Sequence, residues 1–209
     1  MTLSRAYILA KIKTATQPSA HPRWSALIPK RGQADKAGRT DMFVQEAEYG
    51  LATIVRVPVF EKVPDAVANV LRECNILKIK AAPQTVLQNL NWSGVDITFG
   101  NATADDLAGL VVAKAGVAET GTLVLCSGAR TPTALNFLPD VHIVVLREQD
   151  IQDNYETVWQ ALGSDTGMLP RTVNWITGPS RTADIEQTML LGAHGPRKLV
   201  ILLINEKPG

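Results

Sequence analysis

The sequence predicts an α/β fold: a mostly parallel sheet flanked by helices, preceded by an N-terminal helix and an extended arm. Short, continuous apolar runs recur along the chain from about residue 50 to residue 204. Segments with helical spacing of apolar residues separate most of these runs, which is typical of strands joined by crossover helices. The 209 residues, 45% of them hydrophobic and 20% charged, are sufficient for one domain with a buried core.

The expected elements follow one another at short intervals. A helix is predicted over residues 4–14, and residues 16–39, which are rich in Pro, Gly and Lys, are typical of a loop or arm. We therefore divide the chain into an N-terminal helix and arm over residues 1–39 and one domain over residues 40–209. The predicted helices of that domain are 41–49, 64–73, 83–90, 103–110, 153–162 and 184–191. The predicted strands are 51–57, 76–80, 95–99, 141–146, 173–177 and 199–204, with adjacent apolar runs at 111–118 and 122–126.

Charge is distributed unevenly along the chain. The net charge is +1, yet residues 1–40 contain eight Lys or Arg and a single acid, Asp35, so they carry about +7 and the remainder about −6. A basic arm of this kind either docks on an acidic partner or is simply solvated. The near-neutral total and the aromatic content of 5% disfavour nucleic-acid binding.

Several functional classes are excluded by composition and motif. Two cysteines, Cys74 and Cys126, and three histidines are too few and too widely spaced for an iron–sulfur cluster or a structural zinc site, so no metal site is expected in this chain. The sequence contains neither a glycine-rich phosphate loop nor a Gly-x-Ser-x-Gly nucleophile elbow. No apolar run approaches the ~20 residues that span a bilayer, and no signal-peptide pattern is present, so we predict a cytoplasmic protein.

The first candidate site lies in the glycine-rich stretch 116–122, between two apolar runs. In open α/β sheets, ligands bind outside the carboxyl ends of strands, where loops expose backbone N–H groups. Thr120, Gly121 and Thr122 form a turn of the kind that can present such groups to an anion. Glu119 supplies a carboxylate at this turn, as a candidate base or nucleophile. The alternative is a tight structural turn in which Glu119 pairs with a nearby cation.

The second candidate site is the stretch 178–186, after a predicted strand. The Ser180 and Thr182 hydroxyls, the Arg181 guanidinium and the backbone around Gly178 together suit a carboxylate or phosphate. The alternative is helix capping by Ser180, with two acidic residues in the early turns of the following helix. Capping would explain the serine and the acids, but it gives no reason for an arginine between two hydroxyl residues.

A glycine-flanked histidine follows this stretch, in the run 192–197. His194, with Gly195 next to it, is a candidate general acid or base, or a group that orients a ligand carboxylate. The alternative is that these glycines and the histidine end the preceding helix.

These motifs together resemble a known family. Gly-Val-Ala-Glu-Thr-Gly-Thr-Leu-Val-Leu (116–125), Gly-Pro-Ser-Arg-Thr-Ala-Asp-Ile-Glu (178–186) and Leu-Gly-Ala-His-Gly-Pro-Arg (191–197) closely resemble the lactate utilization protein C family, the stand-alone form of the LUD domain. The resemblance implies a fold like that of NagB, ribose-5-phosphate isomerase (RpiA) and the coenzyme A transferases. It also implies a subunit of a system that oxidises L-lactate to pyruvate. In that system two iron–sulfur partner proteins carry the clusters, and this chain binds none.

The fold relatives suggest a rival function. Coenzyme A transferases use a glutamate in a Ser-Glu-x-Gly turn, and residues 118–121 of this chain read Ala-Glu-Thr-Gly. A stand-alone acyl-transfer or isomerase-type enzyme that acts through Glu119 on a small phosphorylated or thioester substrate is therefore the second hypothesis. A non-catalytic assembly subunit is the third.

Overall fold

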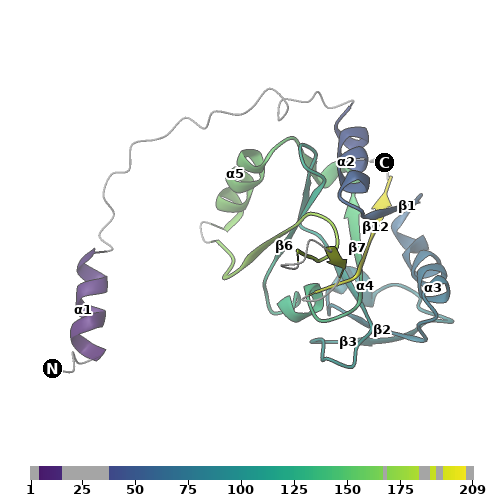
Figure 1. Cartoon of the computed structure of the whole chain (residues 1–209), viewed down its shortest axis with the longest axis horizontal. Helices are drawn as coiled ribbons and strands as arrows, with labels where there is room; N and C mark the ends of the chain where they lie inside the picture. Colours follow the sequence, from purple (N-terminus) through teal and green to yellow (C-terminus); the bar gives the residue numbers. More distant parts are fainter. Residues whose placement is uncertain (1–4, 16–37, 167–168, 184–188, 192–194, 206–209) are drawn as a thin grey trace.

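A six-stranded parallel sheet forms the centre of the structure, a computed structural model that describes residues 5–15, 38–166, 169–183, 189–191 and 195–205 (Figure 1). Its strand order is β1-β12-β7-β4-β2-β3, and every neighbouring pair is parallel. The strands are β1 (Thr53–Val57), β2 (Lys78–Ala81), β3 (Asp96–Phe99), β4 (Ala108–Val112), β7 (Val141–Arg147) and β12 (Lys198–Ile204). This confirms the predicted fold class, a mostly parallel sheet with flanking helices.

The two central strands are nearly continuous apolar runs, as expected for strands that are covered on both faces. Six of the seven residues of β7 and six of those of β12 are buried. Successive residues point to opposite faces, so Ile143 and Val145 enter one core while Val144 and Leu146 enter the other.

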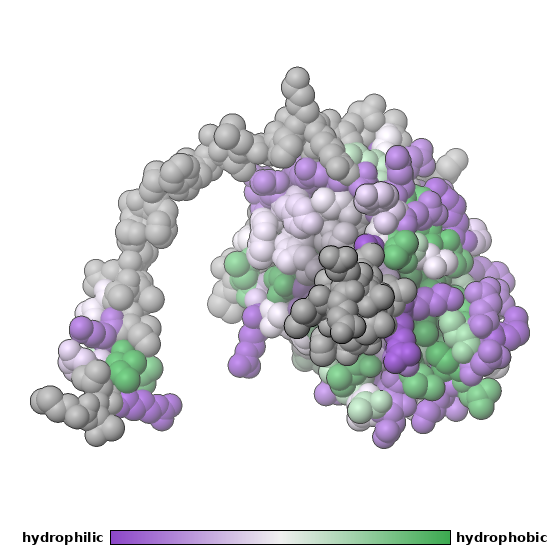
Figure 2. Space-filling view, in the orientation of Figure 1, coloured by the Kyte–Doolittle hydropathy of each residue, from purple (hydrophilic) through white to green (hydrophobic). Residues whose placement is uncertain are grey.

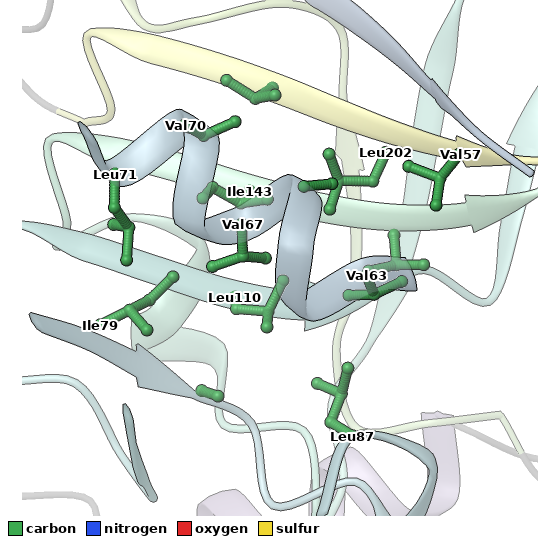
Figure 3. Close-up of a cluster of buried hydrophobic side chains, with 14 of the residues drawn as sticks. Val57, Val63, Val67, Val70, Leu71, Ile79, Leu87, Leu110, Ile143 and Leu202 are labelled. Carbon is green, nitrogen blue, oxygen red and sulfur yellow. The ribbon is translucent and has the colours of Figure 1, made fainter. Parts of the chain in front are cut away.

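Helix α3 (Val63–Glu73) covers the first face of the sheet. Its buried residues Val63, Val67, Val70 and Leu71 recur at helical spacing and pack on side chains from five strands (Figure 3). The short 3-10 helix η2 (Phe60–Lys62) precedes α3, and α4 (Thr85–Gln88) lies at the lower border of the same core. Burial of each such aliphatic side chain stabilises the fold by about 1.5–3 kcal/mol.

The second face is covered by helix α2 (Arg39–Tyr49) and a smaller sheet. That four-stranded sheet has the order β8-β5-β6-β9, with β5 (Ala115–Val117), β6 (Thr122–Cys126), β8 (Ile151–Gln152) and β9 (Val173–Ile176). Helix α5 (Tyr155–Thr166) packs on its outer side. The Arg39 guanidinium donates to both carboxylate oxygens of Asp153, at 2.6 and 3.1 Å, and so joins the start of α2 to this layer.

The structure contradicts two predicted helices, the second of them only over its last three residues. Residues 103–110 form a turn followed by β4, because the carboxylate of Asp106 accepts hydrogen bonds from the backbone N–H and the hydroxyl of Thr103 at 2.8 and 3.0 Å. Of the predicted helix 184–191, residues 184–188 lie outside the described residues, and residues 189–191 form strand β11, which pairs in antiparallel fashion with β10 (Arg181–Ala183). Two further 3-10 helices are η3 (Thr133–Asn136) and η4 (Glu148–Asp150).

Helix α1 (Arg5–Ala15) confirms the predicted N-terminal helix, and three of its large apolar residues, Tyr7, Ile8 and Leu9, are about half exposed. On the face of the domain shown in Figure 2, hydrophilic and hydrophobic residues are interspersed. None of the helices that the structure describes is long and apolar enough to cross a membrane.

Candidate functional site

The turn between β5 and β6 lies directly on the backbone of α2. Gly121 adopts φ 63°, and a Cβ atom there would lie 2.2 Å from the backbone nitrogen of Ala47. Only glycine permits this approach, because a side chain would overlap the helix. The glycine predicted to expose N–H groups to a ligand therefore has a packing role: it brings Thr120 and Thr122 against the second half of α2.

The loop after β9 reaches the same end of α2. Gly178 has φ 81°, and a Cβ atom there would lie 2.1 Å from the carbonyl oxygen of Gly50. The Arg181 guanidinium donates a hydrogen bond of 2.7 Å to that same oxygen. A cation at the carboxyl end of a helix is favourable because the last carbonyl groups carry partial negative charge. One of the five N–H donors of Arg181 is thus used to hold the loop, and four remain within the part of the chain that the structure describes.

Four hydroxyl groups form a network between these two loops. The Thr122 hydroxyl, which is fully buried, lies 2.7 Å from that of Thr120, 2.9 Å from that of Tyr155 and 2.6 Å from that of Thr177. The Thr120 hydroxyl also donates to that of Tyr155 at 3.0 Å. Side chains from β6, α5 and the two loops are thereby held in one arrangement.

Counting protons fixes the direction of these hydrogen bonds. Each hydroxyl has one proton, and that of Thr120 goes to Tyr155. Thr122 must then donate to Thr120, which leaves Tyr155 as the donor to Thr122. Thr177 must donate to Thr122 in turn. All four protons are used within the network, so Thr120 and Thr177 offer only lone pairs to a ligand.

A cavity of about 560 Å³ opens beside this network. Among the described residues, Arg181 is the one cation that lines it, and the Thr120 and Thr177 hydroxyls contribute hydrogen-bond acceptors. Glu46 and the end of α2 add negative charge to the same wall, which disfavours a highly charged anion. The cavity therefore suits a ligand with one negative charge that also carries a hydrogen-bond donor; its lining residues are Glu46, Tyr49, Gly50, Thr120, Thr177, Pro179 and Arg181.

A second cavity, of about 250 Å³, lies against the same loop. Gly178, Ser180 and Gly195 line it, together with the fully buried His142 of β7. The Ser180 backbone N–H donates to the carbonyl of Pro196 at 2.8 Å, which ties the loop to the segment that enters β12. Sequence reasoning did not select His142, although one polar residue within the apolar run 141–146 was a visible signal.

The comparisons with known proteins agree with this architecture. A family model described as the LUD domain matches residues 97–204, just over half of the chain. The chain belongs to the LUD-domain family. The match covers both loops that form the cavities.

Several relatives share the LUD domain. An uncharacterized protein from Neisseria meningitidis is 39% identical over 46% of this chain and 42% of its own length, and the uncharacterized protein YkgG from Escherichia coli is 28% identical over 83% of each. A protein from Geobacillus kaustophilus named lactate utilization protein C is 29% identical over 47% of this chain and 42% of its own. Apart from the YkgG alignment, the matched region thus spans less than half the length of these relatives.

A solved structure shares the fold of this LUD domain. The crystal structure of a DUF162 family protein from Deinococcus radiodurans superposes with a TM-score of 0.63 over 82% of this chain and 99% of that chain, at 22% identity.

The structure brings together only part of the predicted LUD-domain site. Thr120 and Arg181 line the larger cavity, and Gly178, Ser180 and Gly195 line the smaller one, while Gly121 and Thr122 lie behind the walls. Thr182 is in β10, where it pairs with Leu190. His194 lies outside the described residues, and no group of three or more potential metal ligands occurs among those that are described.

Glu119 is not among the residues that line either cavity. Its backbone N–H donates to the carbonyl of Asp153 at 3.1 Å, and its side chain is partly buried. A role for Glu119 in proton handling stays a prediction.

The location of the two cavities differs from the one expected. Both loops were predicted to lie at the carboxyl ends of strands, and the 178–181 loop does follow β9. In the six-stranded sheet, however, this loop contacts Pro196, just before the start of β12, and Gly50, just before the start of β1. The end of β9, in the smaller sheet, lies beside the beginning of β12, in the parallel sheet. The candidate site is therefore nearest to the amino-terminal edge of the parallel sheet.

Proposed function

We propose that this chain is a cytoplasmic component of a system that oxidises L-lactate to pyruvate, and that it binds a small hydroxylated carboxylate in the Arg181 cavity. Two iron–sulfur partner proteins would carry the electrons, and this chain would bind no cluster of its own. Relatives from Geobacillus kaustophilus and Macrococcus caseolyticus named lactate utilization protein C support the lactate role. Because the matches span less than half of those proteins, their whole activity is part of the proposal.

One observation carries the choice of ligand: within the part of the chain that the structure describes, the cavity pairs a single cation with hydroxyl groups that act only as acceptors. The carboxylate of L-lactate accepts hydrogen bonds from the remaining N–H donors of Arg181. Its α-hydroxyl can donate to a lone pair of Thr177 or Thr120. Pyruvate has the same carboxylate but a keto oxygen in place of the hydroxyl, so it cannot make the second interaction.

Calorimetric titration of the isolated chain with L-lactate and with pyruvate tests this assignment. We expect L-lactate to bind about 2–10-fold more tightly, because one net hydrogen bond contributes roughly 0.5–1.5 kcal/mol. Arg181→Ala should weaken L-lactate binding about 10-fold or more, since it removes the charged partner of the carboxylate.

The matched control is Arg72→Ala, which removes an exposed arginine from α3 on the other face of the sheet. Unchanged L-lactate affinity in Arg181→Ala, with the control also unchanged, would exclude Arg181 from ligand binding. In that case the assembly-subunit hypothesis would be favoured. A tenfold loss in both variants would indicate a general charge effect instead.

A further inference from the structure

The smaller cavity contains a buried polar group that the proposed function does not use. His142 is 1% exposed and lines this 250 Å³ space. The alternation along β7 places its side chain on the face of Val144 and Leu146, between the two sheets. Neither of its ring nitrogens has a hydrogen-bond partner within the part of the chain that the structure describes.

An unpartnered imidazole at this position is costly. A buried donor or acceptor left without a partner costs about 1–3 kcal/mol, and imidazole has one of each in its neutral form. A leucine or valine, like the neighbours of His142 along β7, would avoid this cost. The space open to a group that satisfies His142 is the cavity that it lines.

The electrostatics of the cavity restrict what this group is. Burial lowers the pKa of His142 to about 3, so the ring is neutral at physiological pH. Among the described residues, none that lines the cavity is charged. A carboxylate or phosphate there would be buried without a cation, which is strongly unfavourable. The lining residues are Asn136, Phe137, His142, Trp175, Ile176, Thr177, Gly178, Pro179, Ser180, Gly195, Pro196 and Leu199.

We propose that this cavity is a second ligand site, which takes a small uncharged molecule with a carbonyl, amide or hydroxyl group that hydrogen-bonds to His142. The volume equals that of about eight water molecules, at roughly 30 Å³ each, and so fits a compound of up to about ten non-hydrogen atoms. The buried Asn136 and the Ser180 hydroxyl supply further polar groups, and Phe137 and Leu199 supply apolar walls. This site differs in charge from the Arg181 cavity, with which it shares the lining residues Thr177 and Pro179.

Nuclear magnetic resonance of the full chain, with 15N-labelled histidine, tests the proposal directly. The probes are matched pairs that differ in charge: acetamide and acetate, lactamide and L-lactate, benzamide and benzoate. We expect at least one neutral amide to shift the His142 ring resonances in a saturable way. The carboxylate of the same pair should leave them unchanged in Arg181→Ala, where the neighbouring cavity has lost its cation.

His142→Phe provides the control, because it keeps an aromatic ring and removes both polar atoms. This variant should melt at a higher temperature than the wild type in the absence of probe and should lose the amide binding. If it fails to fold, the wild-type titration still decides the question.

Saturable shifts of the His142 resonances by the carboxylates in Arg181→Ala, or a lack of response to all three amides, would overturn the proposal. A water-filled cavity would give the second of these results, together with a lower melting temperature for His142→Phe, because bound water would then already satisfy the ring.

Discussion

The hydroxyl network predicts a large stability loss for a nearly isosteric substitution, Thr122→Val. The side chain keeps its volume in a fully buried position but loses its hydrogen bonds to Thr120, Tyr155 and Thr177. Three bonds at about 0.5–1.5 kcal/mol each give roughly 1.5–4.5 kcal/mol. Thr177 is exposed and can bond to water instead, so we expect a loss of about 2–3 kcal/mol.

Urea denaturation followed by circular dichroism measures this loss. In thermal denaturation of a domain of this size, a loss of 1 kcal/mol lowers the melting temperature by about 2–4 °C, so the melting temperature of Thr122→Val should fall by roughly 4–12 °C. The matched control is Thr98→Val on the exposed side of β3, which should change the free energy of unfolding by no more than about 0.5 kcal/mol. A loss below about 0.5 kcal/mol in Thr122→Val would refute the network as a source of stability. The proton count that makes Thr120 and Thr177 acceptors would then lose its basis.

Three other outcomes are expected. Gly178→Ala should destabilise the fold by at least about 2 kcal/mol, because its φ is 81° and the new Cβ would meet the Gly50 carbonyl oxygen. The control Gly163→Ala in α5, where a Cβ atom meets nothing within 4 Å, should be neutral or stabilising by up to about 1 kcal/mol. Equal effects of the two substitutions in chemical denaturation would contradict the packing argument. The unfolded chain protonates His142 near pH 6.5, whereas the native chain does so near pH 3. The free energy of unfolding should therefore fall by up to about 1.4 kcal/mol per pH unit as pH decreases through that window, and urea titrations at several pH values should show that His142→Leu lacks this pH dependence. Glu119→Gln should keep L-lactate affinity within about twofold in calorimetry, because Glu119 lines neither cavity. A tenfold loss of affinity would favour the stand-alone enzyme. So would turnover of acyl-coenzyme A or phosphorylated sugars by the wild type that is absent in Glu119→Gln.

The parallel sheet was predictable because its strands are buried on both faces. Apolar runs such as 141–146 and 199–204 have no other plausible role in a chain of this composition, and each is a central strand. The smaller sheet was not predicted, because its strands are short and the run 111–118, in which Lys114 is the one charged residue, extends over the end of β4 and all of β5.

The two wrong helices have local causes. Asp105 and Asp106 resemble the acidic first turn of a helix, yet the carboxylate of Asp106 holds the backbone of Thr103 in a turn. Burial raises the pKa of Asp106, but these hydrogen bonds and the nearby Lys80 and Lys78 outweigh it and lower the pKa overall. Near residue 189 the apolar run suits either a helix or a strand, and pairing with β10 selects the strand.

The candidate site was only partly predictable for a similar reason. The loops with Thr120 and Arg181 were visible as motifs, and both reach the larger cavity. The network that defines its chemistry joins Thr120, Tyr155 and Thr177, which come from three separate segments. Only tertiary structure brings such residues together, and the same holds for His142 and the loop 178–180, which line one cavity.

The central claim is that this chain works in L-lactate oxidation through the Arg181 cavity. The most direct test is to purify the tagged chain from lactate-grown cells and to measure the iron content and the L-lactate oxidation rate of the eluate, with the wild type and Arg181→Ala in parallel. We predict iron-containing partners in both eluates, and oxidation that is at least tenfold slower in Arg181→Ala. An iron-free, inactive wild-type eluate would contradict the complex, and equal oxidation rates would contradict the role of the cavity.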